Sequence, residues 1–303
     1  MDVKWREKMV LEVKLANYDF DLPLARVTSF RIGGPADLYV EPETSGKLRE
    51  VIEYCFRNNI PWLFLGRGSN VLVKDKGVRG VVIRLGKGFS YTKVEEQQVK
   101  AGAATPLSVV AEVAAKHALT GLEFASGIPG STGGAVFMNA GAYGGEMKQV
   151  VHRVEVYEPG GDIRTLDREA LGFAYRSSVL QQGRQIVLEV LMELAFGKEE
   201  AIREKMADYN QKRRQKQPLE FPSAGSVFKR PEGYYAGALI QEAGLKGARI
   251  GDARVSDKHA GFIINTGKAT AADVLALIEL VQTQVSKKCG VRLEPELRIV
   301  GDD

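Results

Sequence analysis

Residues 127–145 form the segment that most constrains what this chain can fold into and do. They read GIPGSTGGAVFMNAGAYGG, with seven glycines among nineteen residues and no Lys, Arg, Asp or Glu. The glycines alternate with apolar side chains such as Val136, Phe137 and Met138, which a flexible linker would lack. Because glycine has no Cβ, such a backbone can approach a ligand closely and turn its N–H groups toward phosphate oxygens. The segment therefore predicts a ligand-binding loop; the alternative is a loop packed tightly against a neighbouring strand.

Composition limits the class of protein. The chain has 303 residues, 44% of them hydrophobic, which is enough for a large core and for about two or three domains. The net charge of +4 is scattered, so nucleic acid is not indicated as a partner, whereas an anionic small molecule is compatible with it. Cys55 and Cys289 lie far apart without CxxC spacing, and the three histidines lack metal spacing. We therefore expect neither a disulfide framework nor a metal site.

The chain shows no targeting or membrane signal. No apolar run reaches membrane-spanning length, and the charged N-terminus lacks the apolar region of a signal peptide. We expect a soluble, cytoplasmic monomer with no membrane insertion. The densest basic run, KRRQK at 212–216, predicts either a solvated helix end or a phosphate contact.

Hydrophobic periodicity predicts alternating strands and helices. An amphipathic helix is expected over 45–59, with Leu48, Val51, Ile52, Cys55 and Phe56 on its apolar face. A second helix should follow Thr105 as its cap, with Pro106 in its first turn. Later helices are expected over 198–216, 235–242 and 270–288, the last with its apolar face made by Val274, Leu277, Ile278, Val281 and Val285. Strands are expected over 36–41, 61–65, 71–73, 78–85, 98–101, 151–158, 186–196, 260–265 and 291–300.

These elements predict three parts with an α+β character. A change of character near residue 197 and a softer one near residue 86 divide the chain into 1–85, 86–197 and 198–303. The first two parts contain much β-structure around few helices, unlike a regular doubly wound sheet.

A second glycine-rich loop, GRGSN at 66–70, lies between two predicted strands. It has neither the third glycine and following helix of a Rossmann fingerprint nor the Gly-Lys-Ser/Thr of a P-loop, and residues 127–145 fail the same tests. Two such loops suggest a nucleotide diphosphate held without either motif. Hydroxyls of Ser69, Ser131 and Thr132 could add to the backbone donors.

Seven sequence blocks, taken together, resemble one enzyme family. They are TSFRIGG at 28–34, LGRGSNVLV at 65–73, GLEFASGIPGSTGG at 121–134, NAGAYG at 139–144, YRSS at 175–178, AGSVFK at 224–229 and LEPELRIVG at 293–301. In this order they are similar to the UDP-N-acetylenolpyruvoylglucosamine reductases (MurB). The resemblance implies an FAD-binding fold of the PCMH/vanillyl-alcohol-oxidase type in two subdomains, followed by a C-terminal α/β domain that binds substrate.

The family's cofactor and substrates are also implied. FAD would be reduced by NADPH, and its N5 would then pass hydride to the enolpyruvyl ether of UDP-N-acetylglucosamine-enolpyruvate, giving UDP-N-acetylmuramate for peptidoglycan. The cofactor-binding residues implied by the family blocks are Arg31, Gly66, Arg67, Gly68, Ser69, Asn70, Gly127, Ile128, Pro129, Gly130, Ser131, Thr132, Gly133, Gly134, Asn139, Gly141 and Ala142.

Three residues match the family's catalytic positions. Arg176 would pair with the substrate carboxylate, although by itself it reads equally as a structural salt bridge. Ser226 would donate the proton, which a serine can do only if its alkoxide is stabilised; taken alone it reads as a turn serine. Glu296 would polarise the enolate, if alternation along 291–300 turns Glu294, Glu296 and Arg298 away from the core and toward the site.

The substrate-binding residues are less firmly indicated. Tyr175, Lys216, Lys229 and Arg230 are candidates, and His259 precedes a buried strand near the expected site. The short span between Tyr175 and Ser226 lacks the tyrosine insertion of one branch of the family, so the chain resembles the shorter type II form. Lys216 and the loop 218–222 are candidates to cover the substrate in its place. Alternatives to the reductase are another flavin oxidoreductase on the same scaffold and a non-catalytic nucleotide-sugar binding protein.

Overall fold

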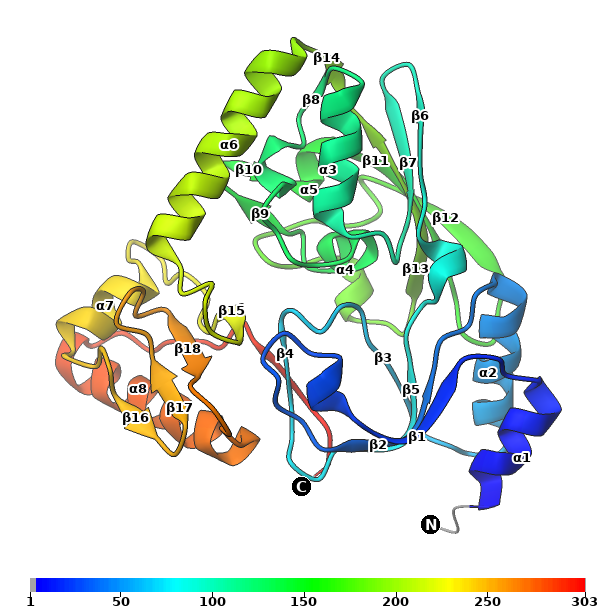
Figure 1. Cartoon of the computed structure of the whole chain (residues 1–303), viewed down its shortest axis with the longest axis horizontal. Helices are drawn as coiled ribbons and strands as arrows, with labels where there is room; N and C mark the ends of the chain where they lie inside the picture. The colour runs from blue at the N-terminus through cyan, green and yellow to red at the C-terminus, as the bar shows by residue number, and fades with distance from the viewer. Residues whose placement is uncertain (1–3, 303) are drawn as a thin grey trace. The chain divides into compact units, whose positions relative to one another are not determined.

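The computed structural model describes residues 4–302, which divide into two compact units (Figure 1). Unit 1 comprises the chain up to Asp19, then Leu38–Arg67 and Val81–Arg213. Unit 2 comprises Phe20–Asp37, Gly68–Gly80 and the chain from Arg214 onward. Each unit has a separate core of buried apolar side chains. Both units are discontinuous in sequence, because the chain passes from one to the other several times, the last time between Arg213 and Arg214.

An antiparallel five-stranded sheet, in the order β12-β11-β13-β7-β6, forms the centre of unit 1. Its strands are β6 (Thr92–Glu95), β7 (Gln98–Gly102), β11 (Val151–Tyr157), β12 (Ile163–Asp167) and β13 (Ile186–Glu193). β13 reads IVLEVLME and is buried along most of its length, as expected for a central strand. The helices α3 (Leu107–Lys116) and α4 (Thr132–Phe137) pack beside it, α4 on β13 and β7 and α3 on β6 and β7.

The N-terminal part of the chain contributes two helices and a second sheet. The helix α1 (Lys4–Val13) packs on α2 (Ser45–Arg57), whose N-cap Thr44 accepts a hydrogen bond from the Lys47 N–H at 3.2 Å. The sheet has the order β1-β2-β5-β3. Its strands are β1 (Tyr18–Pro23), β2 (Pro35–Val40), β3 (Trp62–Phe64) and β5 (Val78–Ile83).

The long helix α6 (Glu199–Lys216), which belongs to unit 1 as far as Arg213, makes charged contacts with the rest of that unit. Arg203 pairs with Glu112 of α3 at 3.0 Å, and Lys205 approaches the buried carboxylate of Glu123 at 3.6 Å. Hydrogen bonds also connect Glu123 to Thr120 Oγ1 at 2.6 Å and to the Gly121 N–H at 2.9 Å. The helix buries Ile202 and Met206 in the core of unit 1, and these polar contacts add to that packing.

Unit 2 is built on the sheet β15-β18-β17-β16 and the helices α7 (Ala236–Glu242) and α8 (Ala271–Cys289). The strands are β15 (Ser223–Ser226), β16 (Arg249–Ile250), β17 (Ala253–Val255) and β18 (Phe262–Asn265). A separate parallel pair joins β4 (Val71–Val73) to β19 (Arg298–Val300) near the end of the chain.

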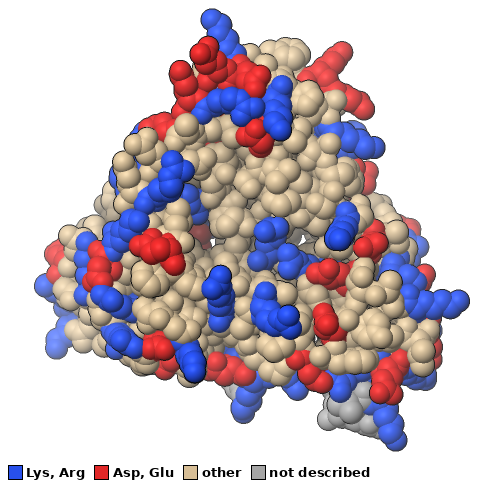
Figure 2. All heavy atoms as spheres, in the orientation of Figure 1, with Lys and Arg blue, Asp and Glu red and all other residues tan. Residues whose placement is uncertain are grey.

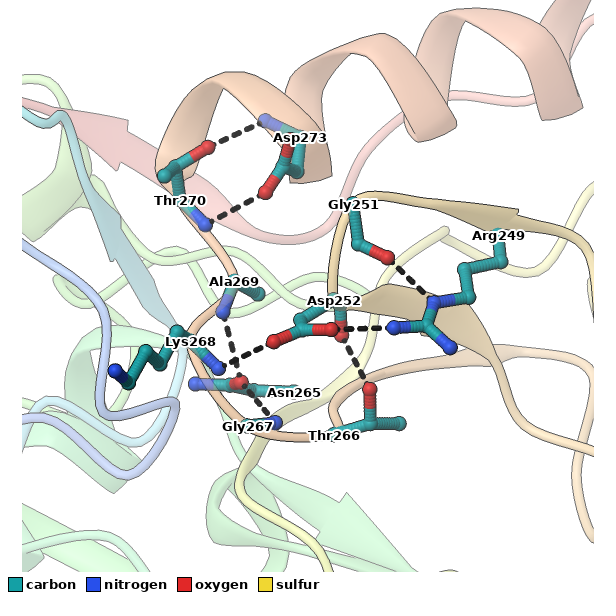
Figure 3. Close-up of polar contacts among 10 residues, drawn as sticks. All are labelled: Arg249, Gly251, Asp252, Asn265, Thr266, Gly267, Lys268, Ala269, Thr270 and Asp273. Atoms are coloured by element: carbon teal, nitrogen blue, oxygen red, sulfur yellow. Dashed lines mark hydrogen bonds and ion pairs between the residues drawn. The ribbon is translucent and has the colours of Figure 1, made fainter.

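The start of α8 is held by a continuous set of hydrogen bonds (Figure 3). Thr270 and Asp273 form a reciprocal capping box, with bonds of 2.9 and 3.0 Å. Before it, Asn265 Oδ1 accepts from the Gly267 and Ala269 N–H groups, and Asp252 accepts from the Lys268 N–H at 2.8 Å. These bonds fix the path of the chain from β18 into the helix.

Several predicted elements are confirmed. The five predicted apolar residues of α8 are buried, as are Leu48, Val51, Ile52 and Cys55 of α2. The strand predicted over 36–41 is β2, and those predicted over 98–101 and 151–158 are β7 and β11. Sequence periodicity succeeds here because one face of each element packs on a core.

Other predictions are wrong. Phe56 is 46% exposed, whereas Tyr54, which was not predicted to face the core, is buried. Thr105 does not cap α3: Pro106 is the N-cap, and the Thr105 hydroxyl donates to the Tyr91 carbonyl at 2.9 Å. The strand expected over 291–300 is limited to Arg298–Val300. Glu294 and Arg298 are exposed, as the predicted alternation requires, but Ile299 is also 41% exposed, so the alternation does not continue along the strand.

The face of the molecule seen in Figure 2 shows no single dominant charge. In the view of Figure 2, basic and acidic side chains are interspersed over most of the visible face. Among residues 4–302, no helix combines the length and apolar character needed to cross a bilayer. The same residues contain no cluster of three or more His, Cys, Asp or Glu suited to a metal ion.

Candidate active site

A short helix opens inside the glycine-rich segment, contrary to the sequence prediction. α4 begins at Thr132, and the hydroxyl of its N-cap, Ser131, accepts from the Gly134 N–H at 3.3 Å. The Thr132 hydroxyl donates to the Thr105 carbonyl at 2.9 Å. Of the three hydroxyls that we expected to donate to a ligand, that of Thr132 instead gives its single hydrogen to the loop itself, whereas that of Ser131 accepts and keeps its hydrogen.

Three glycines of this segment are required by close packing. A Cβ on Gly133 would lie 2.9 Å from the Cβ of Ala103, and one on Gly145 would lie 2.5 Å from the ring of Phe124. A Cβ on Gly141 would lie 2.6 Å from the Gly145 carbonyl oxygen across the tight hairpin of β9 (Gly141–Ala142) and β10 (Gly145–Glu146). The tight-packing alternative thus accounts for part of the glycine content.

The rest of the segment offers backbone donors beside those of the loop 66–70. A Cβ on Gly66 would lie 3.2 Å from Ser131 Oγ, so the two glycine-rich loops adjoin within unit 1. Within residues 4–302, no hydrogen bond to protein is made by the N–H groups of Gly66, Arg67, Gly127, Gly130 and Ser131. Unpaired backbone N–H groups are the donors that phosphate oxygens require, so these two loops are candidates for a diphosphate site.

The end of the loop 66–70 belongs to unit 2 and has a defined conformation. Gly68 has φ +63°, and a Cβ there would lie 2.7 Å from the Val27 carbonyl oxygen. Its own carbonyl accepts from the Ser29 N–H at 3.1 Å, and the Ser29 hydroxyl donates to the Ser223 carbonyl at 2.7 Å. Glycine is therefore required at this position both by conformation and by space.

Within unit 2, hydrogen bonds bring together the backbone segments that carry three predicted site residues: Ser226, Glu296 and Asn70. Ser226 ends β15, and the carbonyl of the next residue, Val227, accepts from the Glu296 N–H at 2.7 Å. Asn70 Nδ2 donates to the Glu296 carbonyl at 3.1 Å, and the Asn70 carbonyl accepts from the Arg298 N–H at 3.1 Å. Residues separated by more than two hundred positions thus meet at one end of β15. Ser226 is half-buried, and its hydroxyl makes no protein hydrogen bond within the described part of the chain.

The cations near Ser226 in sequence have other contacts. The Lys229 ammonium lies 3.4 Å from the Glu294 carboxylate, and the Arg230 guanidinium lies 4.1 Å from the centroid of the Tyr235 ring. His259 Nδ1 accepts from the Gly261 N–H at 3.1 Å. Burial lowers the pKa of His259, and Lys246 and Lys216 lower it further, so its imidazole is neutral at pH 7.

Arg176 lies in unit 1 and has an unusual backbone. Ala174 and Ser177 exchange two backbone hydrogen bonds of 3.1 Å, which close a four-residue turn with Arg176 in its third position. Arg176 has φ +54°, a conformation that turns usually assign to glycine and that costs about 1–3 kcal/mol for other residues. Its Nη2 donates to the Gly141 carbonyl at 3.2 Å, and its guanidinium lies 5.2 Å from the centroid of the exposed Tyr175 ring.

The side chain of Asn139 is engaged within the protein. Asn139 is fully buried with φ +41°; its Nδ2 donates to Glu146 Oε2 and to the Ala174 carbonyl, each at 3.0 Å. Its Oδ1 accepts from the Lys148 N–H at 2.9 Å. Asn139 therefore connects the turn that carries Arg176 to the residues that follow β10.

Comparison with known proteins identifies the family. A curated UDP-N-acetylenolpyruvoylglucosamine reductase from Caldanaerobacter subterraneus subsp. tengcongensis is 52% identical over 92% of each chain, and one from Clostridium novyi is 51% identical over 91% of this chain and 90% of its own. The chain belongs to the UDP-N-acetylenolpyruvoylglucosamine reductase family. The crystal structure of the MurB enzyme from Thermus caldophilus is 39% identical, with a TM-score of 0.80 over 92% of this chain and 97% of its own.

The family's two sequence domains cover most of the candidate residues. A model described as an FAD binding domain matches residues 36–167, and one described as the C-terminal domain of UDP-N-acetylenolpyruvoylglucosamine reductase matches 217–300. Ser226 and Glu296 lie in the second match, whereas Arg176 lies between the two. As a member of this family, the chain is an FAD-dependent oxidoreductase.

A more distant structure shows the same fold. A berberine bridge enzyme variant shares 11% identity with a TM-score of 0.50 over 64% of this chain and 43% of its own. With the family match, this confirms the predicted α+β class and the FAD-binding fold of the PCMH/vanillyl-alcohol-oxidase type.

The helix α6 contributes to the glycine-rich segment in a way that the sequence did not predict. Tyr209 stacks on Tyr143 with ring centroids 4.6 Å apart, and a Cβ on Gly127 would lie 2.7 Å from Asn210 Oδ1 and 3.0 Å from Arg213 Cδ. Burial lowers the pKa of Arg213, an effect that Tyr143 opposes. The basic run at 212–216 was the one available signal. It is not uniformly solvated: Lys212 is exposed and pairs with Asp208 at 2.6 Å, while Arg213 lies beside Gly127.

Proposed function

We propose that the chain catalyses the NADPH-dependent reduction of UDP-N-acetylglucosamine-enolpyruvate to UDP-N-acetylmuramate, a step of peptidoglycan precursor synthesis, with FAD as its cofactor. The observation that carries the proposal is the 52% identity with a UDP-N-acetylenolpyruvoylglucosamine reductase over 92% of both chains. The preference for NADPH over NADH and the monomeric state remain predictions. Steady-state rates with each nucleotide and sedimentation of the purified protein would test them.

The cofactor site that fits best is the pair of glycine-rich loops. The unpaired N–H groups of Gly66, Arg67, Gly127, Gly130 and Ser131 are suited to the diphosphate of FAD. When bound, FAD would supply the hydride that the reaction requires. The protein's own tasks are then to bind the substrate carboxylate, to stabilise the charge that develops on it and to deliver one proton.

Arg176 and Glu296 are assigned to stabilise the negative charge that develops on the substrate carboxylate as it becomes an enolate. A guanidinium can hold a carboxylate by two parallel hydrogen bonds and follow the growth of negative charge on it. The turn that carries Arg176 exposes Tyr175 and holds the guanidinium near the Gly141 carbonyl. The Glu296 side chain would act on the enolate end of the substrate, from a backbone fixed by Val227 and Asn70.

Ser226 Oγ is assigned as the proton donor to the carbon next to the carboxylate. Its hydroxyl is free to face a substrate, since it makes no protein hydrogen bond within residues 4–302. A serine is a weak acid, so its alkoxide must be stabilised at the moment of transfer. Lys229 already pairs with Glu294. To stabilise the alkoxide, Lys229 would have to leave Glu294, or another residue would have to supply the positive charge.

The variant Ser226→Ala separates the two half-reactions. We expect NADPH to bleach the visible absorbance of the variant at nearly the normal rate. The return of the visible absorbance when the enolpyruvyl substrate is added should be about a hundredfold to ten-thousandfold slower than in the unaltered protein. This is the usual contribution of a positioned acid to the rate. Stopped-flow absorbance at the flavin band measures both rates.

Ser223→Ala, on the same strand, is the matched control and should leave both rates unchanged. Equal losses in the two half-reactions of Ser226→Ala would contradict its assignment as proton donor. Visible absorbance bleached by NADPH, with no conversion of the enolpyruvyl substrate by the unaltered protein, would instead indicate another flavin oxidoreductase. A colourless protein that binds the UDP-sugar would indicate a binding protein.

A further inference from the structure

The turn that carries Arg176 accepts hydrogen bonds from side chains that lie outside the turn. Its third residue, Arg176, is in the left-handed region with φ +54°, where a residue other than glycine stays only if its surroundings hold it. Asn139 Nδ2 donates to the carbonyl of the first residue of the turn, Ala174, at 3.0 Å. The carbonyl of Arg176 itself accepts a hydrogen bond of 3.0 Å from Gln181 Nε2.

Gln181 makes a second strong contact. Its Nε2 also donates to the Phe137 carbonyl at 2.9 Å, so the side-chain amide bridges two backbone carbonyls. An amide NH2 has two hydrogens, and both are used in this way. A third, weaker contact of 3.7 Å reaches Met138 Sδ.

Phe137 is the last residue of α4, the helix within the glycine-rich segment. Carbonyls at the end of a helix lack intrahelical partners and need others. The Phe137 carbonyl accepts from Gln181 and also from the Ser178 hydroxyl at 2.8 Å. Gln181 thus joins the end of the glycine-rich helix to the one residue of the turn that departs from ordinary backbone geometry. All of these residues belong to unit 1.

We propose that Gln181 is a positioning residue for Arg176. Its amide holds the Arg176 carbonyl, and with it the left-handed turn, at a fixed place relative to the end of α4. The guanidinium at the tip of the turn is therefore oriented before any substrate arrives. The catalytic consequence rests on the function proposed above, whereas the structural consequence can be measured without it.

Two variants remove this hold in different ways. Gln181→Leu keeps a side chain of similar size and loses both donors. Gln181→Glu keeps the shape but places a carboxylate oxygen against two carbonyl oxygens, so it should disturb the turn more. Gln182→Leu is the matched control, because Gln182 is the next residue and is exposed.

Hydrogen exchange of the holoenzyme tests the structural part. The Ser177 N–H donates to Ala174 and closes the turn. We expect it to exchange faster in both Gln181 variants than in the unaltered protein, with Gln182→Leu unchanged. Unchanged exchange at Ser177 in both Gln181 variants would overturn the proposal, whatever reaction the enzyme catalyses.

Kinetics test whether Gln181 acts through Arg176. The substrate-dependent half-reaction should slow about tenfold to hundredfold in Gln181→Leu, the scale of loss for a misplaced catalytic group, while reduction by NADPH stays within about twofold. In an Arg176→Ala background, Gln181→Leu should cause no further loss. A further loss in that background, or equal losses in both half-reactions, would show that Gln181 only supports the fold. If the unaltered protein and Gln182→Leu fail to convert the substrate, the proposed function fails, and the exchange result alone decides the role of Gln181.

Discussion

At the scale of single residues, the glycines of this chain fall into groups that the sequence does not distinguish. Gly133, Gly141 and Gly145 leave no room for a Cβ, whereas the Cβ of an alanine at Gly144 would meet no atom within 4 Å. Gly68 and Gly144 also have positive φ angles. A glycine-rich segment can therefore serve both close packing and ligand binding. Only the folded structure shows which glycine serves which purpose.

Gly145→Ala is expected to destabilise the protein through a steric clash alone. The new Cβ would lie 2.5 Å from the ring of Phe124, and overpacking of this kind costs about 1–3 kcal/mol. Thermal unfolding of the holoenzyme measures the loss. The control is Gly161→Ala, whose Cβ would meet Glu158 at an ordinary 3.5 Å or more and should change stability by less than about 0.5 kcal/mol. Equal melting temperatures for the two variants would refute the steric argument.

At the scale of elements, helices are held by their ends and by polar contacts as much as by apolar faces. Asp75 accepts hydrogen bonds from the first two N–H groups of α8, those of Ala271 and Ala272, at 2.7 and 2.9 Å. Its carboxylate also interacts favourably with the positive end of the helix dipole. The sequence predicted α8 and its buried face but offered no sign of this cap, since Asp75 is nearly two hundred positions away.

Asp75→Ala should therefore destabilise unit 2 by about 1–2 kcal/mol, the usual cost of removing a helix cap. Urea unfolding followed by a probe in unit 2 would measure it. Glu279→Ala, an exposed position on the same helix, should have little effect. If the free energy of unfolding of Asp75→Ala equals that of this control within error, water satisfies the first N–H groups of α8 no less effectively than Asp75, and the prediction is wrong.

The attachment of α6 depends on pH through Glu123. Burial by itself would raise the pKa of Glu123, but the hydrogen bonds from Thr120, its own backbone and Gly121, together with Lys205, outweigh this and lower the pKa. A carboxyl group with a lowered pKa in the folded state stabilises the fold at pH values above its unfolded pKa. That contribution is lost as the pH falls through the folded pKa.

Glu123→Gln should accordingly lose about 1–3 kcal/mol at pH 7 and show a smaller loss of stability on acidification than the unaltered protein. Unfolding free energies measured from pH 7 down to the acid limit of folding would test both points. Glu200→Gln, an exposed change on α6, is the control. Parallel pH profiles for the unaltered protein and Glu123→Gln would rule out the ionised carboxylate as the source of stability.

At the scale of the whole molecule, the chain consists of two units that each bury a core of their own. The core of unit 2 includes Phe30, Ile32 and Leu72, which come from the first quarter of the sequence. Its strand β19 pairs with β4, which lies in the same early part. The C-terminal family match at 217–300 therefore covers less than a complete folding unit.

Residues 214–303 expressed alone should consequently fail to form a cooperative fold. Without Phe30, Ile32 and Leu72, the remaining core would contain a large void. Calorimetry and amide dispersion in NMR spectra would show it, with the full chain as the reference. A sharp unfolding transition in this fragment would contradict the two-unit description.

The sequence by itself determined the family, the fold class and the elements whose apolar residues repeat with a clear period. α8 and most of α2 were predicted because one face of each helix packs on a core, and periodicity records that directly. The glycine-rich loops were predicted from their glycine content, and Arg176, Ser226 and Glu296 from the family's sequence blocks. Neither kind of evidence says how these residues are arranged in space.

Only the tertiary structure decided how residues far apart in sequence constrain one another. The contacts of Glu296 with Asn70 and Val227, and that of Gln181 with Phe137, are hydrogen bonds between segments distant in sequence. The strand expected over 291–300 failed for the same reason, since pairing with β4 limits it to three residues. Periodicity shows which face of a helix or strand is buried. It does not show which carbonyl or N–H group from a distant part of the chain will form a hydrogen bond with that element.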